Sequence, residues 1–422
     1  MIRITYKYAA LMALFAFLGN IGFLRAGDTT TEPDVDHCIS CHQELDVLPS
    51  GFNKDDIHIK SGLSCAGCHG GDKTREDMDE AMSAKAGFIG VPKRSEIPDF
   101  CGRCHSDIKF MRVYQPRIQT DQESQYFTSI HGKRLRNGDK KVAVCTNCHT
   151  SHSIFSAQDP RSTVYALNVP ETCNHCHGDP NYMKDYDIPT DQYSKYAGSV
   201  HGIALLEKRD TGAPACNDCH GNHGAFPPGV SSISHVCGLC HVNNLQYFTA
   251  SAMGKAFAEQ NLHACEECHG NHGVQPASDD MVGTGEKSVC IECHGEGDRG
   301  YQVADSISSE LKAAVQKYQE ALSIREDVKT AGMDDIDIGY LLQDAHQDLI
   351  QSRTLVHTFD PVRVSAKTLG SLKNSEQAIK LAKSEIEEYA VRRKGLGVAT
   401  IFITIIVVAL FFKIRQMENK DS

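Results

Sequence analysis

The apolar positions of the chain change their spacing near residue 300. Beyond that point an apolar residue recurs every three or four positions, in the series Ala304, Ile307, Leu311, Ala314, Tyr318 and Ala321. This spacing is typical of one face of an amphipathic helix, and Gly332 with Asp334 and Asp335 interrupts it. We therefore expect a first long helix that starts at about Tyr301.

Two further helices are expected after this one. The segment 336–357 presents Leu342, Leu349 and Ile350 around His346, with His357 three helical turns further on and near the same face. Asp360 and Pro361 signal a new helix N-terminus. The third helix carries Leu372, Ile379, Ala382, Ile386 and Tyr389 inward. The pattern predicts a three-helix bundle over residues 301–394, which can run straight into the apolar run described next.

A run of eighteen residues without charge, Gly395–Phe412, lies between Arg392-Arg393-Lys394 and Lys413-Ile414-Arg415. Its length meets the lower limit for a membrane-spanning helix, and a buried core helix is the alternative. The basic residues on the two sides are nearly balanced, so they do not orient the span. We expect one C-terminal transmembrane helix over residues 395–413 and a tail over 414–422.

A second apolar run, from about Ala9 to Leu24, follows Arg3 and Lys7. This arrangement is typical of a secretory signal, which is either cleaved or retained as an anchor. In both cases the chain is exported over residues 28–394. The tail after Lys413 is then expected in the cytoplasm.

The region 28–300 has few regularly spaced apolar residues. The whole chain contains 34 Gly and 14 Pro, and we expect loops and short helices with little strand before residue 300. The formal net charge of -11 makes nucleic acid a poor partner and favours a protein with a basic docking surface.

The motif Cys-x-x-Cys-His occurs nine times and uses all 18 cysteines. It is the attachment signature of c-type haem, in which two thiols bind the porphyrin and the histidine is the proximal iron ligand. Zinc knuckles and disulfides also use Cys-x-x-Cys, but neither requires a histidine directly after it. We number the sites 1 to 9 in chain order: Cys38, Cys41 and His42; Cys65, Cys68 and His69; Cys101, Cys104 and His105; Cys145, Cys148 and His149; Cys173, Cys176 and His177; Cys216, Cys219 and His220; Cys237, Cys240 and His241; Cys265, Cys268 and His269; Cys290, Cys293 and His294.

The sites repeat as one single site followed by four modules of two sites. A similar stretch precedes each module and carries His58, His131 or His201 in the first three. The first site of each of the last three modules has another histidine three residues on, at His152, His223 and His272. We predict that these six histidines are distal iron ligands, because neutral imidazole is the usual nitrogen ligand of haem iron. A solvated loop histidine beside a haem edge is the alternative reading.

Further distal candidates are His37, His235, His263, Met253, His346 and His357. Met253 stands in the fourth module where the first three have histidine. A thioether ligand raises the reduction potential of haem iron, so ligation by Met253 predicts one haem well above the rest. Alternatively, Met253 packs on a porphyrin face and His263 ligates, or that iron is five-coordinate. Either of His346 and His357, by ligating a terminal haem, would dock the bundle onto the haem region.

The nine attachment sites, the Ser-x-His-Gly stretches at His131 and His201, and the Cys-His-x-x-His runs at His152, His223 and His272 resemble those of the multihaem c-type cytochromes of anaerobic respiratory bacteria. The resemblance covers residues 37–300. It implies nine covalently bound haems, a haem-packed fold that is mostly α and irregular, and periplasmic electron transfer from a quinol-oxidising membrane system to downstream acceptors. Met253 departs from uniform histidine ligation.

Our first hypothesis is a membrane-tethered electron-transfer protein, which needs no small-molecule substrate. A second is a multihaem reductase or oxidase of a nitrogen or sulfur oxyanion, which requires an open iron position and acid–base residues above it. A third is a cytochrome subunit of a larger quinol-oxidising complex with an integral membrane partner. The apolar C-terminal run contains no histidine, so we expect it to carry no haem itself.

Overall fold

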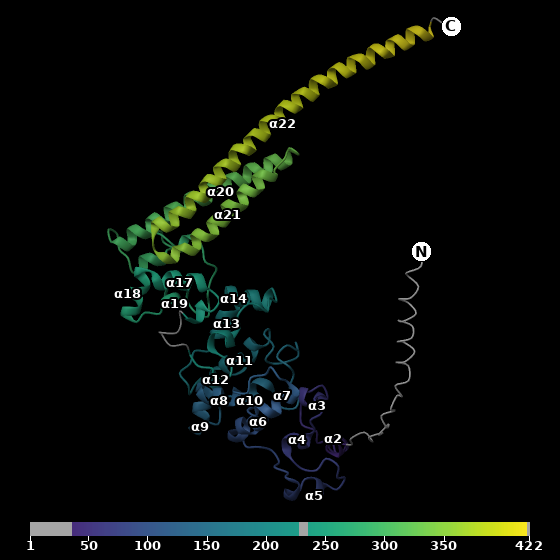
Figure 1. The fold of residues 1–422 in the computed structure, drawn as a ribbon, viewed down its shortest axis with the longest axis vertical. Coiled ribbons are helices and arrows are strands. Elements are labelled where there is room, and N and C mark those ends of the chain that lie inside the picture. The colour runs from purple at the N-terminus through teal and green to yellow at the C-terminus, as the bar shows by residue number, and fades with distance from the viewer. Residues whose placement is uncertain (1–35, 228–234, 420–422) are drawn as a thin grey trace, which may run out of the picture. The chain divides into compact units, whose positions relative to one another are not determined.

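The computed structural model describes residues 36–227 and 235–419, and these contain helices but no strand (Figure 1). This confirms the expected fold class. The predicted signal segment 1–27 lies outside the described residues. The chain packs into two compact units, one of residues up to Ile118 together with Cys145–Phe155, and one of Gln119–Val144 with Ser156–Ser422.

The first unit holds sites 1 to 4 on short helices joined by loops. Many begin at an Asp whose carboxylate accepts a backbone N–H, as Asp36 does for α2 and Asp107 for α7, so local capping starts them. The helices are α2 (His37–Glu44), α3 (Ile57–Lys60), α4 (Cys65–His69), α5 (Met78–Ala81), α6 (Ile97–His105), α7 (Ile108–Tyr114) and α10 (Cys145–His149), with 3-10 turns η1 (Ala84–Ala86) and η2 (Arg94–Glu96).

The second unit begins with the same kind of structure around sites 5 to 9. Its side-chain core there is small, with Val169, Leu205 and Ala215 as one buried cluster. The helices are α8 (Gln122–Thr128), α9 (Ile130–Arg136), α11 (Val169–His177), α12 (Pro180–Met183), α13 (Gln192–Ala197), α14 (Val200–Gly202), α15 (Cys216–His220), α17 (Val242–Ala250), α18 (Ala252–Gln260) and α19 (Ala264–His269), with a π-turn η3 (Ile203–Glu207) and 3-10 turns η4 (Asp279–Met281) and η5 (Val289–Glu292).

Three long helices complete the second unit: α20 (Arg299–Thr330), α21 (Ile336–Leu355) and, after the 3-10 turn η6 (Val356–Thr358), α22 (Pro361–Glu418). Figure 1 shows α20 and α21 beside the first half of α22. Ile307 and Leu311 bury against Val364, and a second cluster contains Ala321, Val328, Ile338, Leu342, Ala378, Ile379 and Ala382. The three-helix bundle predicted from the periodicity is therefore present.

The sequence prediction was wrong for Ile350, which is 43% exposed, whereas Leu342 and Leu349 are buried as expected. Leu349 already fills the position that faces the neighbouring helices, and the adjacent residue is turned about 100° away from it on an α-helix. Helix α21 also ends at Leu355, so His357 lies in the turn η6 rather than on that helix.

The second half of α22 contains the uncharged run Gly395–Phe412. Among the described residues, α22 alone is long and apolar enough to cross a membrane, with a mean hydropathy of 2.7 over its most apolar window and none of that window buried. The part of α22 that precedes this run carries charged and polar residues on its outer face, and its inner face packs in the bundle. One continuous helix thus joins the bundle to a candidate membrane span.

Candidate haem-binding sites

The attachment motif folds into a short helix at seven of the nine sites, on α2, α4, α6, α10, α11, α15 and α19. Residues three apart lie on one face of a helix, so the two cysteines of each such motif point to the same side. The histidine follows at the end of that turn. This places two sulfurs and one imidazole within reach of a single porphyrin.

Six of the motif histidines each have the ring of a second histidine in front of them. The ring centroids are 6.3 Å apart for His69 and His152, 5.9 Å for His58 and His105, 6.1 Å for His131 and His177, 5.8 Å for His220 and His272, 6.3 Å for His201 and His241, and 6.1 Å for His269 and His357. These pairs include five of the six histidines predicted from the repeats, together with His357.

This separation fits two imidazoles on one metal ion. A metal–imidazole bond is about 2 Å long, and the centre of a five-membered ring lies roughly 1.2 Å from each of its atoms for ring bonds of ordinary length. Two nitrogen ligands on opposite sides of one iron therefore place their ring centres about 6 Å apart. Ordinary aromatic pairs also have ring centroids about 4.5–7 Å apart, so the assignment to iron rests on the recurrence of one motif histidine in every pair.

Hydrogen bonds fix which ring nitrogen is free in several of these histidines. The Nδ1–H of His69 donates to the Gly90 carbonyl oxygen at 2.8 Å, that of His220 to Phe226 at 3.3 Å, and that of His357 to Thr354 at 3.0 Å. A carbonyl oxygen only accepts, so Nδ1 must carry the proton. The Nε2 lone pair is then available to a metal ion, which is the usual arrangement around a ligating histidine.

Burial favours the neutral form of the paired histidines. It lowers the pKa of His131, His152, His177, His201, His269, His272 and His357, and for most of them a neighbouring histidine lowers the pKa further. Only neutral imidazole has a lone pair for iron. The environment therefore supports the protonation state that ligation requires.

The pairs follow a rule that relates them to the modules. His58, His131 and His201 each face the second site of the module that they precede. His152 and His272 instead face the first site of the preceding module. Backbone hydrogen bonds hold these stretches together, from Ile57 N–H to Ile154 O and from Val200 N–H to Val274 O. Successive modules thus interlock by exchanging histidines.

The helical bundle takes the place of a further module at the end of the repeats. His357 in η6 faces His269, which is the first site of the last module. Phe359 also contacts the Phe248 ring, with centroids 6.3 Å apart. Repeat arrays commonly end in a structurally different cap, and here the bundle is that cap.

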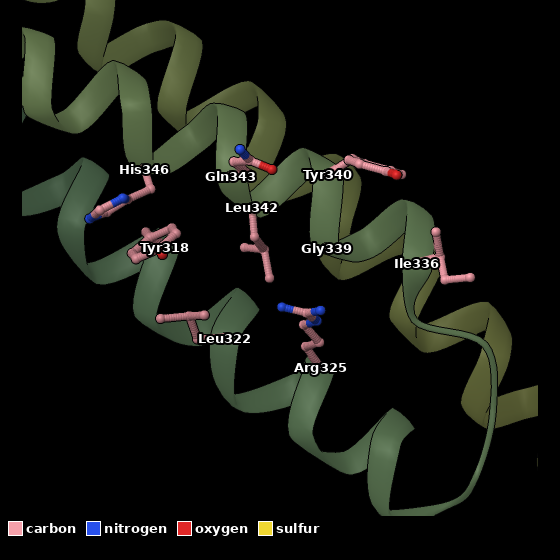
Figure 2. A pocket seen from close by; sticks show the side chains of 9 residues that line it. All are labelled: Tyr318, Leu322, Arg325, Ile336, Gly339, Tyr340, Leu342, Gln343 and His346. Carbon is pink, nitrogen blue, oxygen red and sulfur yellow. The ribbon is translucent and has the colours of Figure 1, made fainter. Parts of the chain in front are cut away.

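His346 lies elsewhere on the bundle, although the sequence placed it near the face of His357. It is exposed on α21, and its ring stacks on Tyr318 at 5.7 Å. Figure 2 shows both side chains at one end of a groove between α20 and α21, which also contains Arg325 and has a volume of about 420 Å³. The two candidate histidines of the bundle therefore have separate surroundings.

A serine and a glycine determine the backbone conformation of the stretch around several predicted distal ligands. Ser199 is fully buried; its Oγ donates to the Tyr196 carbonyl and accepts the Gly202 N–H at 3.0 Å. Ser129 with Gly132 and Ser251 with Gly254 repeat this arrangement. A Cβ on Gly202 would overlap the Tyr196 carbonyl oxygen. The backbone at this point thus needs glycine for close approach.

We predict that Gly202→Ala lowers the free energy of unfolding by about 1–3 kcal/mol, because the added methyl group forces the backbone apart. The melting temperature followed by circular dichroism measures it. Gly198→Ala is the matched control, since the nearest atom to its added Cβ is the Ser194 carbonyl oxygen at 3.7 Å. Equal melting temperatures for the two variants would contradict the steric account.

Neighbouring sites lie close together within each unit. In the first unit the Cys101 thiol hydrogen-bonds with Cys145, and Cys68 interacts electrostatically with Cys104. In the second unit Cys173 contacts Cys216, Cys237 contacts Cys265, and Cys219 interacts with Cys237. Cys268 similarly interacts with Cys290. Sites that follow one another in the sequence are thus spatial neighbours in each unit.

The remaining candidates have different local surroundings. His37 begins α2, His235 is exposed, and the His263 ring contacts Glu266. Burial lowers the pKa of His223. Met253 follows the buried Ser251 in α18, in the register of His131 and His201. Their ligand roles, like those of His42, His149 and His294, stay predictions.

The sequence reasoning missed two carboxylates that hydrogen-bond to histidines of sites 3 and 9. Asp56 accepts from His58 Nδ1 at 3.1 Å, and Asp298 accepts from His294 Nδ1 at 3.3 Å. Burial alone would raise the pKa of Asp56, but hydrogen bonds from His58 and from the Ile154 N–H outweigh it and lower that pKa. The available signal was that Asp56 takes the position that serine occupies in the other modules.

Comparison with known proteins gives one match. The family model described as Cytochrome c3 matches residues 57–178, which hold sites 2 to 5. No curated protein and no solved structure matches the chain. The family match supports a multihaem electron-transfer cytochrome with covalently bound c-type haem.

Proposed function

We propose that the protein is a membrane-tethered periplasmic cytochrome with nine c-type haems, which carries electrons from a quinol-oxidising membrane system to downstream acceptors. The observation that carries this proposal is the set of six histidine pairs, each with one partner from an attachment motif and ring centres 5.8–6.3 Å apart. Bound haem iron would supply reversible one-electron chemistry at each site.

The cysteines and histidines have different roles in binding haem. At the six sites with a histidine pair, the two cysteines would hold the porphyrin covalently, the motif histidine would be the proximal ligand, and the facing histidine would be the distal ligand. Six-coordinate iron has no open position for a substrate. The protein environment then determines the reduction potential through the ligands, their hydrogen bonds and burial.

The order of the sites supports conduction along the chain. Thiol contacts and electrostatic neighbours join sites 3 and 4 in the first unit, and sites 5, 6, 7, 8 and 9 in the second. In this proposal each haem exchanges electrons with the haems before and after it in the sequence. A conduit of this kind needs no catalytic acid or base.

The C-terminal helix supports attachment to the membrane. Because α22 runs without interruption from the bundle into the apolar run, and His357 precedes it, the last haem sites would be tethered to the membrane through the bundle. An integral membrane subunit is the proposed electron donor. The net charge of -11 would favour downstream partners with a basic docking surface.

The spin state of the oxidised protein tests this function. We expect nine haems by mass spectrometry of the mature polypeptide and almost wholly low-spin iron by electron paramagnetic resonance, because histidine on both sides of iron gives a strong ligand field. A substantial high-spin fraction that changes with nitrite, hydroxylamine or sulfite would instead support the oxidoreductase hypothesis. A polypeptide without haem mass would refute both.

A further inference from the structure

One of the four stretches that precede the modules begins with a carboxylate instead of a hydroxyl group. Ser129, Ser199 and Ser251 each accept a backbone N–H from the glycine three residues on. In the first stretch Asp56 takes this N-cap position and accepts the His58 N–H at 2.8 Å. Both residue types cap a helix well, so capping alone does not explain the difference.

Asp56 makes contacts that a serine does not reach. Its Oδ1 also accepts from His58 Nδ1 at 3.1 Å, and its Oδ2 accepts the Ile154 N–H at 2.6 Å. Asp56 is only 3% exposed. In these contacts its partners are two backbone groups and an imidazole, so the negative charge remains close to the His58 ring and poorly screened by water.

We propose that Asp56 is a positioning residue that lowers the reduction potential of the haem at site 3, relative to the haems at sites 5 and 7. This proposal rests on the proposed function, because it requires iron between His58 and His105. A carboxylate that accepts the Nδ1–H of a ligating histidine orients the ring and makes its other nitrogen a stronger donor. Stronger donation and a nearby negative charge stabilise ferric over ferrous iron.

The other paired histidines show why site 3 differs from sites 5 and 7, although at site 9 the exposed Asp298 also accepts from His294 Nδ1 at 3.3 Å. The Nδ1–H groups of His69, His220 and His357 donate to neutral backbone carbonyl oxygens, which add no net charge. The distal histidines of sites 5 and 7 follow Ser129 and Ser199, whose hydroxyl groups contact backbone. Site 3 lies beside sites 2 and 4. The Asp56 charge also acts on His152 and on Cys68 of site 2, so site 3 is compared with sites 5 and 7, which belong to the second unit.

The experiment compares Asp56→Ser and Asp56→Asn with the wild-type protein in a spectroscopic redox titration. Asp56→Ser copies the N-cap of the other modules, so the helix start is retained while the charge is removed. A tenfold gain in the equilibrium constant for reduction would move one of the nine one-electron transitions up by about 59 mV. One low-spin resonance signal is expected to change with it, because the histidine donates less strongly.

Asp77→Ser is the matched control. Asp77 also caps a helix in the same unit and accepts the Glu80 N–H, but it is exposed. This variant removes the same charge and is expected to leave all transitions in place. A shift of equal size in the control would mean that any lost charge acts at long range, and this would overturn the specific role of Asp56.

Haem content and low-spin fraction, measured first, separate failure of this proposal from failure of the proposed function. A wild-type protein without nine low-spin haems refutes the function. Variants with nine low-spin haems and unchanged reduction potentials refute only the role of Asp56.

If both variants lose the site 3 haem, a second test replaces Cys101 and Cys104 by alanine and records which redox transition disappears. The reduction potential of this transition must be lower than those of the transitions lost when sites 5 and 7 are removed in the same way. A higher transition refutes the proposal.

Discussion

Replacing Cys237 and Cys240 by alanine is expected to divide the electron path. Site 7 lies between sites 6 and 8, because Cys237 contacts Cys265 and Cys219 interacts with Cys237. Without both thiols no thioether holds haem there. The variant then lacks about one ninth of the haem, and transfer between site 6 and site 8 must cross the full width of the missing group.

Protein held in a lipid layer on an electrode by its C-terminal helix measures this effect. In the wild-type protein all haems are expected to follow a fast potential scan, detected by their absorbance. In the variant the haems of sites 8 and 9 are expected to follow the potential scan, while the haems of the sites before site 7 change their redox state much later.

The matched control replaces Cys38 and Cys41 at site 1, the first in the chain. Its eight remaining haems are expected to follow the scan together, and an equal lag in both variants would refute conduction in chain order.

His357→Ala is expected to convert one haem, that of site 8, from low-spin to high-spin. The His357 ring lies 6.1 Å from the His269 ring, and its Nδ1–H donates to Thr354 O at 3.0 Å. Removing the ring leaves the proposed iron with five ligands, and five-coordinate haem iron is generally high-spin. About one ninth of the iron should therefore show a high-spin resonance and bind added imidazole, which restores the low-spin signal.

His346→Ala is the matched control for this variant. His346 comes from the same bundle, but it is exposed and stacks on Tyr318 (Figure 2). Its removal is expected to leave the spin state unchanged. His357→Met is a second test of the ligand role, because a thioether would keep the iron low-spin and raise its reduction potential. An entirely low-spin His357→Ala protein would contradict ligation by His357.

The helical half of the fold was predictable because its pattern is local. Apolar residues at helical spacing fixed the inner face of α20, where Ile307, Leu311 and Ala314 are buried as expected. Asp360 and Pro361 correctly marked the start of α22. Ile350 was placed wrongly, because an apolar stripe on a helix can include two adjacent residues, as Ala378 and Ile379 of α22 do. The periodicity alone did not show that α21 buries only Leu349 of the pair Leu349 and Ile350.

The candidate site was predictable only in part. Repetition in the sequence singled out His58, His131, His201, His152 and His272, and the structure places each of them before a motif histidine. His357 carried no such signal, since it is the single histidine of a turn between two long helices. The contact of Asp56 with the His58 ring was also missed, because aspartate and serine are equally good N-caps and the sequence does not show that the carboxylate reaches the imidazole.

By itself the sequence predicts where haem is attached, because two thiols and an imidazole within five residues carry that chemistry without help from the rest of the chain. It also determined the helices of the bundle and the apolar end of α22, through spacing and hydropathy. The tertiary structure alone decided which histidine faces which, since partners such as His269 and His357 are far apart in the chain. Backbone hydrogen bonds between modules and the packing of the bundle bring these histidines together, and no short segment of the sequence predicts either of them.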